Sequence, residues 1–353
     1  MSNFLQLKSF RNFLQRNKLF TAINIFGFAV SLMFVMLIGL YVQDELSVDD
    51  FQANKDRIFR VEYAEGSNLP PALGAAIATR YPEIEAFTRI HACDLTVAPV
   101  SGFTTEENTA DGLFVDSSFF SIFSYPFVEG SPATAMQTPR DVVLTRRFAR
   151  RLFGNEPAMG QTLHIGNNDL TVSGVVDDFE QTAFQSSDIL LPAEKAYAIA
   201  YGIDDPSQMA VINGNYDFGL YLLGRSNSDL AARLDTAELN RLVQEDLQLD
   251  LFQSKHLNHP RLCPLKEVYL SPIPGRGTRS NTRTYLLILG TTAALILLFA
   301  VINYINLSVA QSGFRAQEVA MRRLLGGSRG SLFAGFSVKT VLRPRNGTLY
   351  EAS

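Results

Sequence analysis

Two long stretches without a charged side chain place the strongest limit on how this chain can fold. Residues 19–42 and residues 284–311 contain no Asp, Glu, Lys or Arg. As an α-helix, the first stretch is about 36 Å long, which exceeds the roughly 30 Å hydrocarbon core of a bilayer. The second stretch has a centre rich in Leu, Ile and Ala, residues 286–302, that can also cross. We therefore expect two transmembrane helices, over residues 19–42 and 284–310.

The first stretch could instead be a signal peptide that is removed, because four basic residues precede it. Its apolar part is longer than the roughly 7 to 15 residues of a signal-peptide core. It also continues directly into the polar sequence Gln43-Asp44-Glu45, with no small-x-small cleavage site. We interpret it as an anchor that stays on the chain.

The charges around the first stretch predict its orientation. Residues 1–18 form a basic amphipathic segment without an acidic residue, and the helix is followed by Asp44, Glu45, Asp49 and Asp50. Basic flanks favour the cytoplasmic side of a membrane, so we expect a cytoplasmic N-terminus. Nothing between the two stretches is long and apolar enough to cross. The second helix must then return to the cytoplasm, and residues 43–283 lie outside it.

The region between the two stretches mixes strand and helix patterns. DRIFRVEYA (56–64) alternates like a β-strand, with Ile58, Arg60 and Glu62 on one side. LPPALGAAIATRYPEIEAF predicts a helix that ends before Pro82. These signals, with no regular alternation of strands and helices, indicate a large α+β domain over residues 43–283, which we expect to form two subdomains.

Three further segments of this region have clear local patterns. TLHIGNNDLTVSGVV (162–176) predicts a hairpin, and residues 229–248 predict an amphipathic helix. TRRFARRLFG predicts a helix capped by Thr145 and ended by Gly154. Its arginines flank an apolar face, which favours a solvated helix over a surface for nucleic acid.

Side chains suited to catalysis or metal binding are sparse. His256, His259 and Cys263 have a spacing that can touch a metal, but their segment is turn-like and offers no fourth ligand. The acids in VVDDFE follow a predicted strand and are more typical of a solvated turn than of catalytic carboxylates. No phosphate-binding loop of the form GxxxxGK[ST] and no serine nucleophile motif with a nearby histidine occurs. We expect no catalytic residue, no metal and no cofactor, and we do not expect an enzyme.

The two cysteines, Cys93 and Cys263, both lie in the region outside the cytoplasm. An oxidising compartment permits a disulfide, but two distant cysteines carry no framework pattern. Free buried thiols are the favoured interpretation. Within the membrane stretches, Asn24, Asn303 and Asn306 are polar groups that should avoid lipid, so we expect them to mark the faces where helices pack.

The segment GFRAQEVAMRRLLGG, directly after the second stretch, has the pattern of a short basic amphipathic helix. At helical spacing an apolar side is flanked by arginines, and Glu318 precedes Arg322 by one turn as a favourable pair. Gly326-Gly327 is expected to end the helix. Such a helix can lie on anionic lipid or dock into a groove on a partner. The apolar side is formed by Phe314, Met321, Leu324 and Leu325.

Several motifs, in one order, resemble ABC-transporter permeases of the MacB/FtsX-like type, particularly forms common in Bacteroidetes. FRNFLQRNKLFTAINIFGFAVSL resembles the opening of that family, and YVQDELSVDDFQANKDRIFRV resembles its transition into the periplasmic core domain. FFSIFSYPFVEGSPATAMQTPRDVVLTRRFARRLFGNEPAMGQTLHI, with GVVDDF further on, resembles the body of the domain. INYINLSVAQSGFRAQEVAMRRLLGGSRGSL is similar to its second membrane helix and cytoplasmic coupling segment. The resemblance covers residues 1–333.

The resemblance implies a permease subunit of the bacterial inner (plasma) membrane, with a MacB-like periplasmic core domain and, over residues 311–333, a coupling segment of an FtsX-like permease domain. The implied partners are a separate ABC ATP-binding subunit, a second permease half or a homodimer, and the lipid bilayer, but no nucleic acid. ATP hydrolysis in the partner would drive motion of the periplasmic domain for export or extrusion. The positions that match the coupling motif are Glu318, Arg322, Arg323, Leu325 and Gly326. Together with Arg315 and Met321 they form the predicted partner-binding set.

The chain also departs from this family. Gly327 stands where alanine is more common, and residues 334–353 are polar and broken by Pro344 and Gly347 where the family continues into further membrane helices. We therefore expect a truncated permease with an aberrant tail. One alternative is a two-helix, membrane-anchored periplasmic sensor or ligand-binding protein. A tethered enzyme is a third interpretation, without a catalytic constellation to support it. The transported substrate, whether peptide, lipid, lipoprotein or drug, is not indicated.

Overall fold

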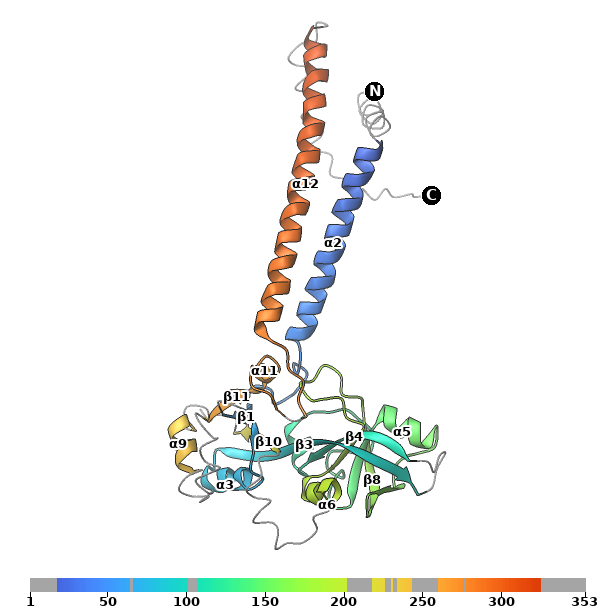
Figure 1. Cartoon of the computed structure of the whole chain (residues 1–353), viewed down its shortest axis with the longest axis vertical. Coiled ribbons are helices and arrows are strands. Elements are labelled where there is room, and N and C mark those ends of the chain that lie inside the picture. The colour runs from blue at the N-terminus through green and yellow to red at the C-terminus, as the bar shows by residue number, and fades with distance from the viewer. Residues whose placement is uncertain are drawn as a thin grey trace, which may run out of the picture. The chain divides into compact units, whose positions relative to one another are not determined.

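The computed structural model describes residues 18–63, 66–100, 107–201, 218–225, 230, 234–242, 260–275 and 277–324 (Figure 1). The chain divides into two compact units. One unit combines residues 1–42 and 287–353, and the other is residues 43–286. Each unit has its own architecture: the described residues of the first are helical, and those of the second form a sheet with short helices around it.

Two long helices account for the first unit. α2 is Lys18–Leu46 and α12 is Arg283–Leu324. Each contains a span long and apolar enough to cross a membrane, Ala22–Leu46 and Arg283–Asn306, both with a mean hydropathy of 2.5. Most of their large apolar side chains are exposed, as expected for helices whose solvent is lipid. Within this unit, Asn303 Nδ2 donates a hydrogen bond to the backbone oxygen of Asn24 at 3.4 Å.

The second unit is built on one sheet of 11 strands, in the order β11-β1-β10-β3-β4-β9-β6-β8-β5, while β2 pairs with β10 and β7 pairs with both β3 and β8. Two neighbouring pairs are parallel, β4 with β9 and β6 with β8. The strands are β1 (Ile58–Glu62), β2 (Asn68–Leu69), β3 (Ile84–Pro99), β4 (Asn108–Val115), β5 (Phe127–Glu129), β6 (Asp141–Thr145), β7 (Thr162–Ile165), β8 (Asn168–Val176), β9 (Ile189–Pro192), β10 (Phe218–Gly224) and β11 (Arg261–Pro264).

Short helices cover this sheet, with α3 and α9 near one end and α5 near the other (Figure 1). They are α3 (Leu73–Arg80), α4 (Phe119–Ile122), α5 (Arg146–Phe153), η1 (Ala193–Lys195), α6 (Ala196–Tyr201), α9 (Thr236–Arg241) and α11 (Leu265–Val268). The expected α+β domain between two apolar helices is therefore confirmed. The part of the domain near α3 and α9 and the part near α5 share a single continuous sheet.

Local signals in the sequence explain several of these elements. The side chain of Thr145 accepts a hydrogen bond from the Phe148 amide at the start of α5, and Gly154 ends the helix at a φ of 64°. β7 and β8 form the predicted antiparallel hairpin, with Gly166 at a φ of 58° in its turn. α3 ends at Arg80, two residues before Pro82. The predictions for these three segments are confirmed.

The predicted continuous helix over residues 229–248 is wrong at its centre. Leu234 lies in a bend, and a new helix, α9, begins after Asp235. The Asp235 carboxylate accepts a hydrogen bond from the Glu238 amide. An aspartate in this position satisfies a free amide at a helix start and therefore favours a break. The apolar positions are nevertheless buried together, namely Leu230, Leu234, Leu239 and Leu242. Residues 243–248 lie outside the described part of the chain.

Three clusters of buried apolar side chains lie along the sheet. One packs Phe148 and Leu152 of α5 against β6 and β8, and another packs α3 against Leu220 and Leu222 of β10. The remaining cluster is rich in aromatic rings. In it, the Phe184 ring lies 4.8 Å from the Phe123 ring, edge to face. Phe184 belongs to a loop that contacts both ends of the domain, so this aromatic cluster supports the site described next.

Candidate functional site: where the two ends of the domain meet

The first and last residues of the domain are joined by hydrogen bonds. We name residues 43–57, which comprise the last turn of α2 and the residues after it, the inbound segment. Residues 269–282, which precede α12, are the outbound segment. Glu45 accepts a hydrogen bond from Tyr269 Oη and another from Asn281 Nδ2, each at 2.6 Å. The backbone amide of Asn281 donates to the Tyr269 carbonyl at 2.8 Å. A single carboxylate therefore contacts two points of the outbound segment.

A loop from the middle of the sequence, residues 181–185, bridges the same two segments. The carboxylate of Asp49 accepts hydrogen bonds from Thr182 Oγ1 at 2.8 Å and from the Ala183 amide at 3.0 Å. On the other side, Arg279 donates its backbone amide to the Ala183 carbonyl and its guanidinium to the Thr182 carbonyl, both at 2.7 Å. The Gln185 amide also donates to the outbound segment. We name this loop the bridging loop.

Asp49 lies in an unusual position for a charged residue. Its residue surface is 0% exposed, and its backbone φ is 61°, in the left-handed region. Burial raises the pKa of its carboxyl from 3.8 to about 6, against the opposing effects of hydrogen bonds from Thr182 and Ala183 and of the positive charge on Arg279. The carboxyl is therefore close to its titration midpoint at mildly acidic pH.

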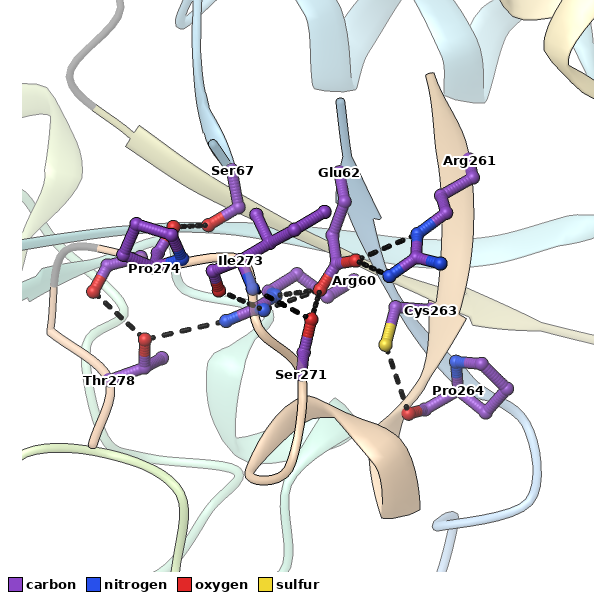
Figure 2. Close-up of polar contacts among 11 residues, drawn as sticks. Arg60, Glu62, Ser67, Arg261, Cys263, Pro264, Ser271, Ile273, Pro274 and Thr278 are labelled. Atoms are coloured by element: carbon purple, nitrogen blue, oxygen red, sulfur yellow. Dashed lines mark hydrogen bonds and ion pairs between the residues drawn. The ribbon is translucent and has the colours of Figure 1, made fainter. Parts of the chain in front are cut away.

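A buried ionic cluster fixes the outbound segment to the sheet (Figure 2). Arg60 and Glu62 lie on the same side of β1, with side chains 1% and 0% exposed, and form an ion pair. Glu62 also accepts hydrogen bonds from Arg261 of β11 at 2.8 Å and from Ser271 Oγ at 3.0 Å. Arg60 donates to the Ile273 carbonyl at 3.0 Å. Charged side chains of β1, the strand beside the edge strand β11, thus bind the outbound segment at Ser271 and Ile273.

The charge balance of this cluster keeps Glu62 ionised. Burial alone would raise the pKa of Glu62, but the charge of Arg60 and hydrogen bonds from Arg60, Arg261 and Ser271 outweigh it, so the pKa lies below its usual value. Cys263 is a neighbour of the cluster (Figure 2), and burial followed by the charge of Glu62 raises the pKa of its thiol to about 12. The Cys263 thiol therefore stays protonated at neutral pH and is not an activated nucleophile.

The two cysteines are free thiols in positions that a disulfide cannot join. Cys93 is half-buried on β3 and Cys263 is buried on β11. Three strand-to-strand steps separate β3 from β11, which corresponds to about 14 Å, whereas bridged cysteines have Cα atoms at most about 7 Å apart. No group of three metal-ligating side chains occurs in the described part of the chain. His256 and His259 lie outside it.

Two acids of VVDDFE and three arginines of α5 have partners within the domain. Asp178 accepts a hydrogen bond from the Arg147 amide at the start of α5 at 3.0 Å, a position where a carboxylate stabilises the helix. Asp177 pairs with Arg146 at 3.2 Å. The carboxylate of Asp188 pairs with Arg147 and Arg151, at 3.5 and 2.9 Å. These contacts join α5 to the rest of the domain.

The polar residues predicted to mark helix packing lie in α2 and α12. Asn303 contacts Asn24 through the hydrogen bond described above, and Asn306 is exposed. Their role in packing stays a prediction. The predicted partner-binding residues Leu325 and Gly326 lie outside the described residues, as does the tail, residues 334–353. The others lie on the helical backbone of α12, namely Arg315, Glu318, Met321, Arg322 and Arg323.

We name the inbound segment, the bridging loop and the outbound segment together the meeting point. Sequence patterns did not indicate the residues that build it. Asp49 and Asp50 look alike in the sequence, and Arg279 is one of several arginines before the second uncharged stretch. The one usable signal is on β1, where the strand period places Arg60 and Glu62 on the same side as the apolar Ile58. Two opposite charges that share a face with an apolar residue are a mark of a buried ion pair, but their partners Arg261 and Ser271 are about 200 positions away.

Together these observations define the class: a membrane protein in which two apolar helices flank a mixed α/β domain whose two ends are joined at one cluster. The sequence profile of the MacB-like periplasmic core domain family matches residues 21–246, and the chain belongs to this family. It carries the MacB-like periplasmic domain of an ABC-transporter permease family, as the motifs of the sequence predicted. No match occurs among curated proteins.

Three solved structures match parts of this chain. A domain described as that of a permease from Porphyromonas gingivalis has 17% sequence identity and a TM-score of 0.48, covering 68% of this chain and 99% of its own. The periplasmic region of MacB from Actinobacillus actinomycetemcomitans has 14% identity and a TM-score of 0.41, with coverages of 60% and 90%. The extracellular domain of the ABC-type transporter YknZ from Gram-positive bacteria has 11% identity and a TM-score of 0.39, with coverages of 58% and 98%.

Proposed function

We propose that this chain is a permease subunit of an ABC transporter in the bacterial inner membrane, with a cytoplasmic N-terminus and its large domain in the periplasm. In this function a separate ATP-binding subunit hydrolyses ATP, and the permease passes the resulting motion to the periplasmic domain for export or extrusion of a substrate. The observation that carries the proposal is the contact of both ends of the domain with the same bridging loop.

The hydrogen bonds of that loop supply the physical basis for transmission. Asp49 on the inbound segment and Arg279 on the outbound segment both contact Thr182 and Ala183. Phe184, the next residue of the loop, packs in the aromatic cluster. A displacement of either segment must therefore move the loop or break several hydrogen bonds, and the loop passes the displacement into the core.

The cytoplasmic side of the proposal rests on the segment after the second span. The backbone of α12 continues as one helix from the span to Leu324, so a force applied to Phe314, Met321 or Leu324 reaches the outbound segment without passing through a loop. A rigid helix transmits such a force better than a flexible linker. The apolar side of this segment is proposed to dock in a groove of the ATP-binding subunit.

Co-purification tests the docking surface directly. In full-length protein, Met321→Glu together with Leu325→Glu buries charge without a partner, so we expect at least about tenfold less of the ATP-binding subunit from the same genome to be recovered. The matched control is Ser312→Glu with Ala316→Glu, which adds the same charge to the opposite side of the helix. Equal recovery from the two double variants would contradict docking and favour a helix that lies on lipid.

A further inference from the structure

The Asp49 carboxylate is enclosed by groups from every part of the meeting point. Thr182 and Ala183 of the bridging loop donate hydrogen bonds to it, and Gln52 is a polar neighbour from its own segment. The charged group that faces it is Arg279 of the outbound segment. Two buried tyrosines also face it: Tyr125, which follows α4, and Tyr221 of β10. Burial is the main cause that raises the pKa of each, and the charge of Asp49 adds to it.

The hydrogen bonds around the carboxylate can exist with either protonation state. When Asp49 is ionised, Thr182 Oγ1 donates to it at 2.8 Å, and Tyr125 Oη, at 3.0 Å from Thr182 Oγ1, can donate in turn. When Asp49 carries a proton, that proton can be donated to Thr182 Oγ1, and the Thr182 hydroxyl then donates to Tyr125 Oη. The Ala183 amide still has an acceptor in the second carboxyl oxygen. The hydroxyl chain reverses while its heavy atoms keep their places.

The ionised state is the less well compensated of the two. Arg279 directs its guanidinium to the Thr182 carbonyl at 2.7 Å, and no ion pair joins it to Asp49 among the salt bridges of the described residues. A buried carboxylate without a direct counter-charge favours the neutral form, in agreement with the pKa of about 6.

We propose that Asp49 is a proton-operated latch, in which proton uptake holds the inbound segment on the bridging loop and proton loss releases it. The latch regulates how firmly the two ends of the domain are coupled, and it depends neither on the ATP-binding subunit nor on the substrate. A failure of the latch would therefore leave the proposed function standing, and the reverse also holds.

The linkage between proton binding and latch closure gives the sign and the size of the effect of pH. An exposed carboxyl in the released segment has the ordinary pKa of 3.8, whereas the enclosed carboxyl has a pKa of about 6. The enclosed state binds the proton more tightly, so acid favours the closed latch. Between pH 7.5 and pH 5, these two pKa values change the ratio of closed to released latch by about tenfold.

Hydrogen exchange of the full-length protein in lipid nanodiscs measures this ratio. The backbone amides of Asp49 and Ala183 donate the hydrogen bonds that join the inbound segment to the bridging loop. We expect their protection factors, which correct for intrinsic exchange rates, to rise about tenfold from pH 7.5 to pH 5 in the unchanged protein. Asp49→Asn should abolish the rise. Asp50→Asn, a neutralisation of the exposed neighbour that pairs with Lys55, should keep it.

A fluorescence titration gives a second measurement, and its midpoint can be read without the Asn variant. The chain contains no tryptophan, so Phe51→Trp creates a single reporter two residues from Asp49, at a ring that contacts Tyr125 at 5.8 Å. We expect its emission to titrate with a midpoint near pH 6, and the titration to vanish when Asp49→Asn is added. Flat emission between pH 5 and 7.5, a pH-independent protection factor, or a response that survives Asp49→Asn would each overturn the latch.

Discussion

Replacing Glu62 by glutamine tests how strongly the buried ionic cluster holds the domain together. The substitution keeps the size of the side chain but leaves the charge of Arg60, which is 1% exposed, without its counter-charge. Removing one partner of a buried ion pair costs about 3–5 kcal/mol. For a domain of residues 43–286, each kcal/mol lowers the melting temperature by about 2–4 °C. We therefore expect Glu62→Gln to lower the unfolding temperature by about 10 °C.

The buried thiol of Cys263 provides the assay. Cys263 is 3% exposed and lies beside the cluster, so it reacts with a thiol-specific fluorescent maleimide only when this part of the domain opens. With Cys93→Ala as the background, Cys263 is the single thiol of the chain. The full-length protein in detergent micelles is heated with the dye, and the temperature of half-maximal labelling is compared between variants.

Two control variants separate an uncompensated charge from a general loss of contacts. Glu85→Gln breaks an exposed ion pair with Arg57 and should change the labelling temperature by less than about 3 °C. The double variant Arg60→Met with Glu62→Leu removes both buried charges and should be more stable than Glu62→Gln alone. If the double variant is the less stable of the two, or if Glu62→Gln behaves like Glu85→Gln, the reasoning about buried charge is refuted.

Two further predictions concern α5 and the orientation of the chain. Thr145→Ala removes the helix cap that accepts a hydrogen bond from the Phe148 amide, and losing such a cap costs about 1 kcal/mol. The Cys263 labelling temperature should therefore fall by about 2–4 °C. Thr145→Ser keeps the capping hydroxyl and should keep the labelling temperature. The orientation is tested in a Cys93→Ala background with an impermeant maleimide added outside intact spheroplasts. A cysteine introduced by Asp169→Cys, where the side chain is 69% exposed, should react, and one introduced by Ser312→Cys should not. The reverse pattern contradicts the proposed orientation.

Elements encoded by neighbouring residues could be predicted from the sequence. The apolar length of the two spans, the cap and glycine stop around α5, and the glycine turn between β7 and β8 are all signals within a few residues. The exception is instructive, because the apolar period over residues 229–248 predicted one helix, while Asp235 provides a new helix start inside it. Periodicity reports which side chains are buried, and a local hydrogen bond decides whether the backbone continues.

The meeting point could not be predicted, because its contacts join distant parts of the sequence. Asp49 and Thr182 are 133 positions apart, and Glu45 and Asn281 are 236 apart. Nothing near Asp49 distinguishes it from the exposed Asp50, since burial depends on where residues 181–185 return in the fold. The motifs did identify the family. Likeness over several segments of a sequence indicates a family even when the contacts between those segments are not known.

The hydrogen bonds that Glu45 accepts from Tyr269 and Asn281 also bear on how such a protein can arise and be rebuilt. Since the first and last residues of the domain lie within hydrogen-bonding distance, the domain has the geometry of an insertion in a helical hairpin. A turn of about two to five residues is sufficient to join two antiparallel helices, so excising the domain requires no rearrangement of the helices themselves. The same closeness allows a different folded module to be grafted at this position, and domains with adjacent termini are those that tolerate such exchange.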